Sequence, residues 1–130
     1  MATGTVVTNA GLVELAKLAC GAAADAFTYV ALGTGGTTPA AGDTALEAEI
    51  STNGGGRVVA DTHAYEADYK AKWVEEFTFS GSLAILECGI LNAASSGDLL
   101  MHHVFASTIN VVSTDTLTLT ITATFSDTTA

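Results

Sequence analysis

The clearest hydrophobic pattern in the chain is a strict alternation of apolar and threonine side chains within residues 114–125. The apolar positions are Leu117, Leu119, Ile121, Ala123 and Phe125. Because successive side chains of a β-strand point to opposite faces, this segment is predicted to be a half-buried strand with one apolar face. Each large apolar side chain is worth about 1.5–3 kcal/mol when buried, so a one-residue slip in register would lose most of this stabilisation.

Similar runs, bounded by turn residues, predict further strands. They cover residues 27–32, 57–65, 69–79, 83–91 and 99–105. In the segment 69–79, Trp73, Phe77 and Phe79 share one face and polar side chains occupy the other. Short strands at this spacing are typical of an antiparallel β-sandwich or a jelly-roll-like barrel. The chain is therefore predicted to be mainly β, as one domain over residues 1–130 with the β-sandwich in residues 27–126.

One short helix is predicted near the N-terminus, over residues 10–21. Its apolar face is predicted from side chains at helical spacing, Leu12, Leu15, Ala16 and Ala19. Thr8 and Asn9 offer capping side chains before the helix, and Gly21 is a suitable residue after it. Residues 1–9 are short and carry no charged side chain, which predicts either a frayed terminus or an N-terminal arm or strand donated to a neighbour.

A glycine-rich loop follows the first of the predicted strands, at residues 33–39. Such loops can cradle phosphate, but no lysine follows these glycines and no helix opens directly on them. The loop is therefore interpreted as a turn. Residues 43–50 are predicted to form one helical turn or an extended segment.

The charge balance argues against one class of partner. Four Lys and Arg residues face fourteen Asp and Glu residues, which gives a formal net charge of −10 although only 14% of the residues are charged. An acidic surface repels phosphate backbones, so no nucleic acid is expected as a partner. The acidity is interpreted as a source of solubility, with attachment to a basic partner as the alternative.

The cysteines and the hydropathy pattern indicate synthesis in a cytoplasm. Cys20 and Cys88 are too few for a disulfide framework; free, buried thiols are expected, and a single bond between them stays open. No basic segment followed by an apolar run is present, so no secretory signal is expected. No uncharged apolar stretch approaches the roughly 20 residues of a membrane span, so no membrane partner is expected.

The histidines do not form a pattern typical of metal binding. His102 and His103 are neighbours on a predicted strand and therefore face opposite sides, one the core and the other the surface or an interface. A site assembled from His63, one of this pair and Glu87 is not predicted by any spacing. No metal and no cofactor is therefore expected.

The remaining ionisable residues do not form a catalytic pattern. Cys88 lies in an apolar strand without an activating cation, which is typical of a small buried hydrophobe. Glu75 and Glu76 are neighbours on a strand and diverge, so a solvated edge is expected rather than a pair of acting carboxylates. No catalytic residue is assigned, and the chain is predicted not to be an enzyme. A small metal-dependent or Cys88-dependent enzyme is the alternative from another class.

Glu87 is the most unusual charged residue in the pattern. It lies among aliphatic residues in the segment 83–91, where a carboxylate needs a partner or solvent. Arg57 is one of only four cations, so we expect a structural ion pair between Arg57 and Glu87.

Several stretches, read together, carry a family resemblance. They are residues 8–12, 29–39, 43–49, 55–57, 87–97 and 115–119. The most specific are the turn Ala31-Leu32-Gly33-Thr34-Gly35, the later Arg57 and the strand Glu87-Cys88-Gly89-Ile90-Leu91-Asn92. In this order they resemble a family of small virion structural proteins of tailed bacteriophages, including tail-fibre N-terminal domains and small proteins encoded beside head genes. Cys88 and Leu91 depart from the Ala and Phe that the resemblance leads us to expect.

The resemblance implies a structural function in the particle rather than catalysis. No fibre shaft follows the domain within the sequence, which favours a capsid decoration (cement) protein that binds the major capsid protein and forms a homotrimer. The alternative is a tail, baseplate or tail-fibre attachment or receptor-binding component, with tail proteins as partners. In either case the protein is expected in the virion, on the capsid surface or on the tail. The uncharged N-terminal segment suits subunit contacts, and its expected interface residues are Thr3, Thr5, Val6, Val7 and Thr8.

Overall fold

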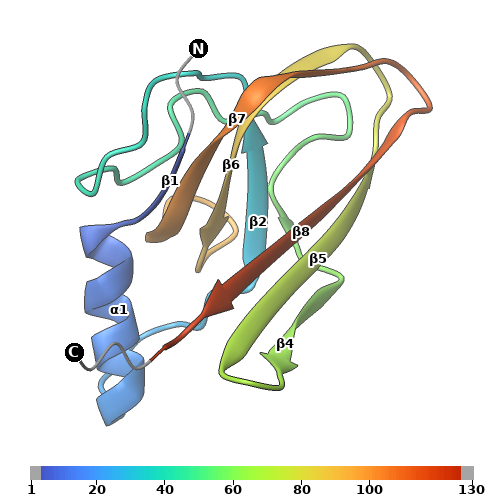
Figure 1. Cartoon of the computed structure of the whole chain (residues 1–130). Coiled ribbons are helices and arrows are strands. Elements are labelled where there is room, and N and C mark those ends of the chain that lie inside the picture. The colour runs from blue at the N-terminus through green and yellow to red at the C-terminus, as the bar shows by residue number, and fades with distance from the viewer. Residues whose placement is uncertain (1–3, 127–130) are drawn as a thin grey trace.

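The computed structural model describes residues 4–126, and this part of the chain is mainly β with one short helix near its start (Figure 1). In chain order the elements are β1 (Gly4–Val7), α1 (Asn9–Cys20), β2 (Tyr29–Gly33), β3 (Val58–Val59), β4 (Thr62–Glu66), β5 (Lys70–Thr78), β6 (Leu83–Leu91), β7 (Leu99–Val111) and β8 (Thr116–Thr124). The fold class predicted from the alternating pattern is confirmed.

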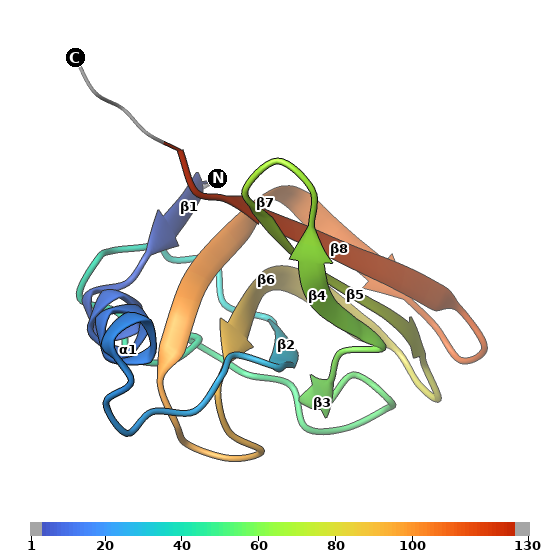
Figure 2. The same ribbon diagram turned by 90° about the horizontal axis from the view of Figure 1, so that it is seen from below.

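The strands form two antiparallel sheets in a sandwich-like arrangement, with α1 beside β7 at one side (Figure 2). The larger sheet has the order β1-β7-β6-β2-β3 and the smaller one β4-β5-β8. The main core lies between the sheets. It includes Trp73 and Phe77 of β5, Ile85 and Ile90 of β6, and Leu119 of β8.

The alternation predicted for residues 114–125 is realised in β8. Nine consecutive residue pairs join β8 to β5 without a shift in register. Leu119 is buried, its apolar neighbours along the strand are half-buried, and the threonines are exposed. Phe125 is the exception: it is 53% exposed, so its predicted place on the buried face is wrong. Phe125 lines a hollow beside Leu12 and Leu15 of α1.

Most predicted strand positions are close to the observed ones. β6 has the predicted bounds, whereas β7 is longer than predicted and extends to Val111. The segment predicted as one strand over residues 57–65 is broken into β3 and β4. It breaks because β3 pairs with β2 in the larger sheet and β4 with β5 in the smaller one, so the chain crosses between the sheets at Ala60 and Asp61.

The helix has the predicted length and caps, but of its predicted apolar face only Leu15 packs against the main core, and Leu12, Ala16 and Ala19 are exposed. The Thr8 hydroxyl accepts a hydrogen bond from the Gly11 amide, and Gly21 has the left-handed backbone of a C-cap, with φ 77°. Only Gly11 and Glu14 are buried, whereas Leu12 is 54% exposed. The helix can approach β7 this closely because Gly11 has no side chain; a Cβ at this position would lie 2.7 Å from the Leu100 backbone.

A long loop covers the outer face of the larger sheet. Residues 34–50 cross this face, and Leu46 of the loop packs in a small cluster with Ala31, Leu91 and Leu99 of the sheet. The segment 43–50 forms no helical turn and instead contains turns and one β-bridge, between Gly33 and Glu49. Within residues 4–126 no helix is long and apolar enough to cross a membrane.

Candidate functional site

The outer face of the larger sheet holds a buried carboxylate, Glu87 of β6, whose side chain is 0% exposed. Its two oxygens accept four hydrogen bonds. Three come from backbone amides of the covering loop: Gly35 at 2.9 Å, Glu47 at 3.0 Å and Ala48 at 2.8 Å. The fourth partner is Nε2 of His102, at 2.7 Å. Both oxygens of the buried carboxylate are therefore fully used, as burial of a charge requires.

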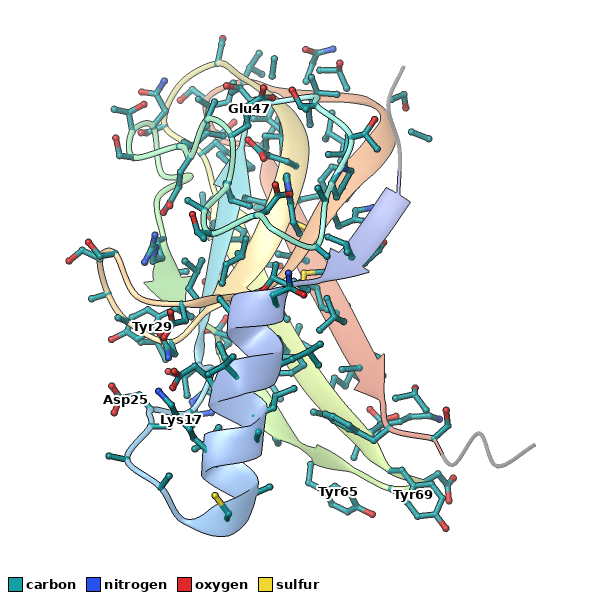
Figure 3. The ribbon with its side chains drawn as sticks, turned by 90° about the vertical axis from the view of Figure 1, so that its left-hand side faces the viewer. Lys17, Asp25, Tyr29, Glu47, Tyr65 and Tyr69 are labelled. Carbon is teal, nitrogen blue, oxygen red and sulfur yellow. The ribbon has the colours of Figure 1, made fainter. Side chains whose placement is uncertain are left out.

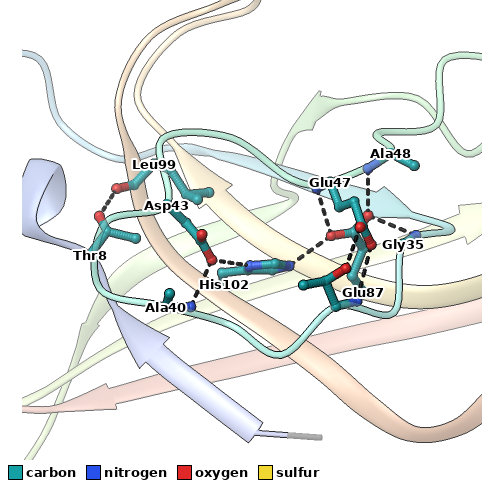
Figure 4. Close-up of polar contacts among 10 residues, drawn as sticks. Thr8, Gly35, Ala40, Asp43, Glu47, Ala48, Glu87, Leu99 and His102 are labelled. Carbon is teal, nitrogen blue, oxygen red and sulfur yellow. Dashed lines mark hydrogen bonds and ion pairs between the residues drawn. The ribbon is translucent and has the colours of Figure 1, made fainter. Parts of the chain in front are cut away.

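His102 continues this contact to a second carboxylate (Figure 4). Its side chain is 3% exposed, and its Nδ1 lies 2.8 Å from Oδ2 of Asp43. The same Asp43 oxygen accepts a hydrogen bond from the Ala40 amide at 2.9 Å. Because an ionised carboxylate only accepts, His102 must hold a proton on each ring nitrogen when both carboxylates are ionised. We call Glu87, His102 and Asp43 the loop clamp.

The local sequence explains how the loop clamp is assembled. Glu87 and Gly89 point to the same face of β6, and Gly89 pairs with His102 on β7. Since glycine has no side chain, the imidazole of His102 has room to reach diagonally to Glu87. A side chain at Gly33 or at Gly35 would come within 2.4 Å or 2.6 Å of the Glu87 carboxylate. The glycine-rich loop therefore encloses a carboxylate of its own chain.

The pKa directions agree with this arrangement. The pKa of Asp43 lies below its ordinary value because the Ala40 amide and then His102 favour the charged form. The pKa of Glu47 is also lowered, mainly by the hydroxyl of Thr37. Hydrogen bonds thus hold the loop carboxylates in their ionised form.

The loop clamp joins two strands to the covering loop rather than lining an accessible cleft. Glu87 and His102 are fully enclosed, and the partners of Glu87 are backbone amides and one imidazole. This arrangement fixes the position of residues 34–50 relative to the sheet. Its chemistry is that of a structural ion-pair network.

The structure overturns the predicted ion pair between Arg57 and Glu87. Arg57 instead binds Glu49 through two hydrogen bonds, 2.6 Å from Nη2 and 2.9 Å from Nε. Its Nη1 donates to the backbone carbonyls of Ala93 at 3.0 Å and Ser96 at 2.8 Å. Glu87 is the deeper carboxylate, and the loop amides and His102 already occupy its oxygens.

The histidine pair behaves as predicted. His102 is buried, whereas His103 is half-buried and faces the other side of β7, with its ring 4.9 Å from that of Phe105. Burial lowers the pKa of His103. His63 is exposed on β4 and is not brought together with the pair.

The cysteines are free, but only one is buried. Cys88 lies in the main core, where burial and then the neighbouring charge of Glu87 raise its pKa to about 12. Its interpretation as an inert buried thiol is consistent with this value. Cys20 is exposed at the end of α1, so the expectation that both thiols are buried is wrong for Cys20.

Glu75 and Glu76 diverge as predicted, but only Glu76 is solvated. Glu75 is 8% exposed and accepts a hydrogen bond from the Asp61 amide at 2.8 Å. Burial raises the pKa of Glu75. The expected solvated edge is therefore wrong for this residue.

The structure gives the predicted interface residues different environments. Thr5 and Val7 are exposed, Val6 is half-buried, and Thr3 lies outside the described residues. β1 pairs with β7 of the same chain, so residues 4–7 are an edge strand of their own sheet. Thr8 is fully buried, caps α1 and donates its hydroxyl to the carbonyl of Leu99, so the structure corrects its assignment to the interface.

Within residues 4–126, one side of the molecule carries almost no charge. β1, β7 and β8 contain no Asp, Glu, Lys or Arg, and the two charged residues of α1 lie 3.1 Å from each other as an ion pair. Val7, Leu12 and Phe125 are 47%, 54% and 53% exposed and line a hollow of about 330 Å³. A second apolar hollow shares Leu15, Leu100 and Phe125 with the first. We call the surface formed by β1, α1 and the C-terminal end of β8 the uncharged side.

Sequence reasoning missed Asp43 and Glu49 as partners of buried groups. Each lies in the loop between β2 and β3, whose path the alternation of apolar residues does not determine. The available signal was Glu87 itself, together with a histidine on the next strand of the hairpin. Within residues 4–126, no three His, Cys, Asp or Glu side chains are arranged to hold a metal ion.

Comparison of the chain with protein-family models finds no match, and comparison with curated proteins finds none either.

Proposed function

We propose that this protein is a non-enzymatic structural protein of a tailed-bacteriophage virion, a decoration protein that binds the major capsid protein and stabilises the head shell. The observation that carries the proposal is the uncharged side. A protein with a net charge of −10 that exposes Val7, Leu12 and Phe125 together presents a surface suited to burial against a partner.

The distribution of the ionisable groups also supports a structural function. The buried Glu87 and the half-buried Asp43 and Glu49 hold loops in place, and each is matched by a cation, an imidazole or backbone amides. Binding of such a preformed surface stabilises a shell by mass action, without turnover. The sequence resemblance described above contributes the class of partner, and a homotrimer is the oligomer that it implies.

The first experiment is to locate the protein in purified phage particles. Quantitative mass spectrometry gives its copy number, and labelling with a specific antibody gives its position. A copy number comparable to that of the major capsid protein, with label on the shell, is expected. A few copies at the tail would support the alternative, a tail or fibre-attachment component. Absence from the particle would overturn both.

A second experiment tests the uncharged side directly. Leu12→Asp places a charge at the centre of this surface and is expected to weaken binding to undecorated shells by about tenfold or more. Val59→Asp is the matched control, because Val59 is similarly exposed (44%) but lies in β3, at the opposite edge of the larger sheet. Equal binding of the two variants, with unchanged melting temperatures, would contradict the assignment of this surface.

A further inference from the structure

The two sheets have four edges, and one of them differs from the rest. β1, β3 and β4 are edge strands of four, two and five residues, whereas β8 is an edge strand of nine. β8 pairs with β5 on one side only, and no described strand bonds to its other side. An edge of this length exposes a row of backbone amides and carbonyls about 30 Å long.

Features that usually prevent edge-to-edge pairing are missing from β8. Its sequence, Thr-Leu-Thr-Leu-Thr-Ile-Thr-Ala-Thr, contains no charge, no proline and no glycine, and its register with β5 has no bulge. The opposite edge of the same sheet is protected: β4 is short and ends in Glu66, near a turn where Asp68 and Tyr69 have positive φ. Natural proteins protect long free edges unless a partner pairs with them.

We propose that a second copy of this chain pairs with this edge. Two β8 strands run antiparallel about a twofold axis at Thr120, so that the two smaller sheets join into one sheet of six strands. Thr120 is the central residue of β8, and this register is the one that pairs all nine residues. Such an interface is isologous and closes on itself.

The charges on the neighbouring strand favour the same register. On the outer face, Lys72 lies in the row of Thr122 and Glu76 in the row of Thr118. With the axis at Thr120, Thr122 of one copy pairs with Thr118 of the other. Lys72 of each copy therefore shares a row with Glu76 of the second copy, about 14 Å apart between Cα atoms, the width of three strand spacings.

Other registers lose this complementarity. An axis at Thr118 places Glu76 of the two copies in one row, so that like charges face each other. An axis at Thr122 does the same for Lys72 of the two copies. The pairing of all nine residues of β8 and the placement of Lys72 opposite Glu76 thus select the same register, each on its own. The attraction acts across two threonines and over more than the screening length of about 10 Å at 0.1 M salt, so it is weak at that salt concentration and stronger at low salt.

The inner face of β8 gains apolar contacts from the pairing. Ile121 is half-buried and lies beside a hollow of about 260 Å³ lined by Met101, His103 and Phe105. In the paired sheet, Ile121 faces Leu119 of the second copy. An acidic chain meets its own copy most easily where neither surface is charged, and β8 provides such a surface.

This inference does not rest on binding to the head shell, and it replaces the homotrimer implied by the resemblance with a twofold dimer. The C-terminal end of β8 belongs to the uncharged side, so the test uses the purified chain without shells. The test is sedimentation equilibrium of the purified chain over a wide concentration range. The expected mass is twice the 13.1 kDa of one chain. Thr120→Lys places two like charges at the axis and is expected to weaken dimerisation at least tenfold. Thr62→Lys is the control, because Thr62 lies in the same row at the opposite edge of the sheet.

The register has its own test. Lys72→Glu and Glu76→Lys each create like charges in the shared rows and are expected to weaken the dimer, whereas the double exchange restores it at low salt. Circular dichroism and thermal melts confirm that each variant is folded; Lys72 also lies 3.5 Å from Glu66 within its own chain. A monomer or trimer at all concentrations, or a dimer indifferent to Thr120→Lys, would overturn the proposal.

Discussion

The loop clamp and the uncharged side place their polar and apolar groups in opposite ways. Around Glu87, charges lie inside the protein and every one has a partner. On the uncharged side, apolar side chains such as Leu12 and Phe125 lie outside, with no described residue covering them. In Figure 3, Glu47 of the covering loop lies at one end of the molecule. Tyr65 and Tyr69, at the tip of the hairpin of β4 and β5, lie at the other end.

The difference predicts which region stabilises the fold and which is available for association. A buried charge is tolerated only where its partners are fixed, so the loop clamp makes the fold sensitive to substitutions. An exposed apolar side chain costs the free protein little and becomes favourable when a partner covers it. Substitutions in the loop clamp should therefore change folding, and those on the uncharged side should change association.

The largest effect is expected from Glu87→Ala. It leaves three loop amides and His102 without an acceptor in a buried site, which should lower the free energy of unfolding by about 3–5 kcal/mol. Urea denaturation measures the change. Glu47→Ala is the control in the same loop, because the Glu47 side chain is exposed and its main hydrogen bonds are to Thr37. A loss no larger than that of the control would show that the loop clamp does not hold the fold.

An intermediate effect is expected from Arg57→Lys. Lysine keeps the charge but cannot bind Glu49 through two nitrogens and also reach the carbonyls of Ala93 and Ser96. We expect a loss of about 1–2 kcal/mol, measured by denaturation. The exposed pair of Lys72 and Glu66 is the comparison, where Lys72→Gln should cost less than about 0.5 kcal/mol. Equal losses would mean that the burial of Arg57 contributes nothing.

The elements of the fold were predictable because their signals are local. The threonine alternation of β8, the caps of α1 and the turns around β6 depend on residues that are close in sequence. The exposed Leu12 and Phe125 were predicted to be buried because a periodic pattern identifies an apolar face but not whether an element covers it.

The loop clamp was not predictable in the same way. Its contacts depend on the register of β6 against β7, which shifts between Ile85 and Glu87, and on the path of residues 34–50. Arg57 was paired with the wrong carboxylate for the same reason. Which of the fourteen acidic residues pairs with Arg57 depends on tertiary structure, and the small number of cations does not predict it.

The smallest effect is expected from a second buried carboxylate, Glu75, which sharpens the comparison with Glu87. Glu87 accepts four hydrogen bonds, whereas Glu75 accepts one, from the Asp61 amide, and the Asp61 charge also opposes its ionisation. Burial, and to a smaller extent the Asp61 charge, raises the folded pKa of Glu75 above the unfolded value of 4.5. Between these two values the folded state binds more protons than the unfolded state, so stability falls as the pH rises through this window.

Glu75→Gln removes the charge and keeps an acceptor for the Asp61 amide. The variant should be more stable than the native chain at pH 7, by less than about 1 kcal/mol, and the difference should vanish below pH 4.5, where the carboxyl is protonated in both states. Thermal melts across this pH range measure it, with Glu76→Gln as the control at the exposed neighbouring position. A gain that is the same at every pH would mean that packing, rather than the ionisation of Glu75, is responsible.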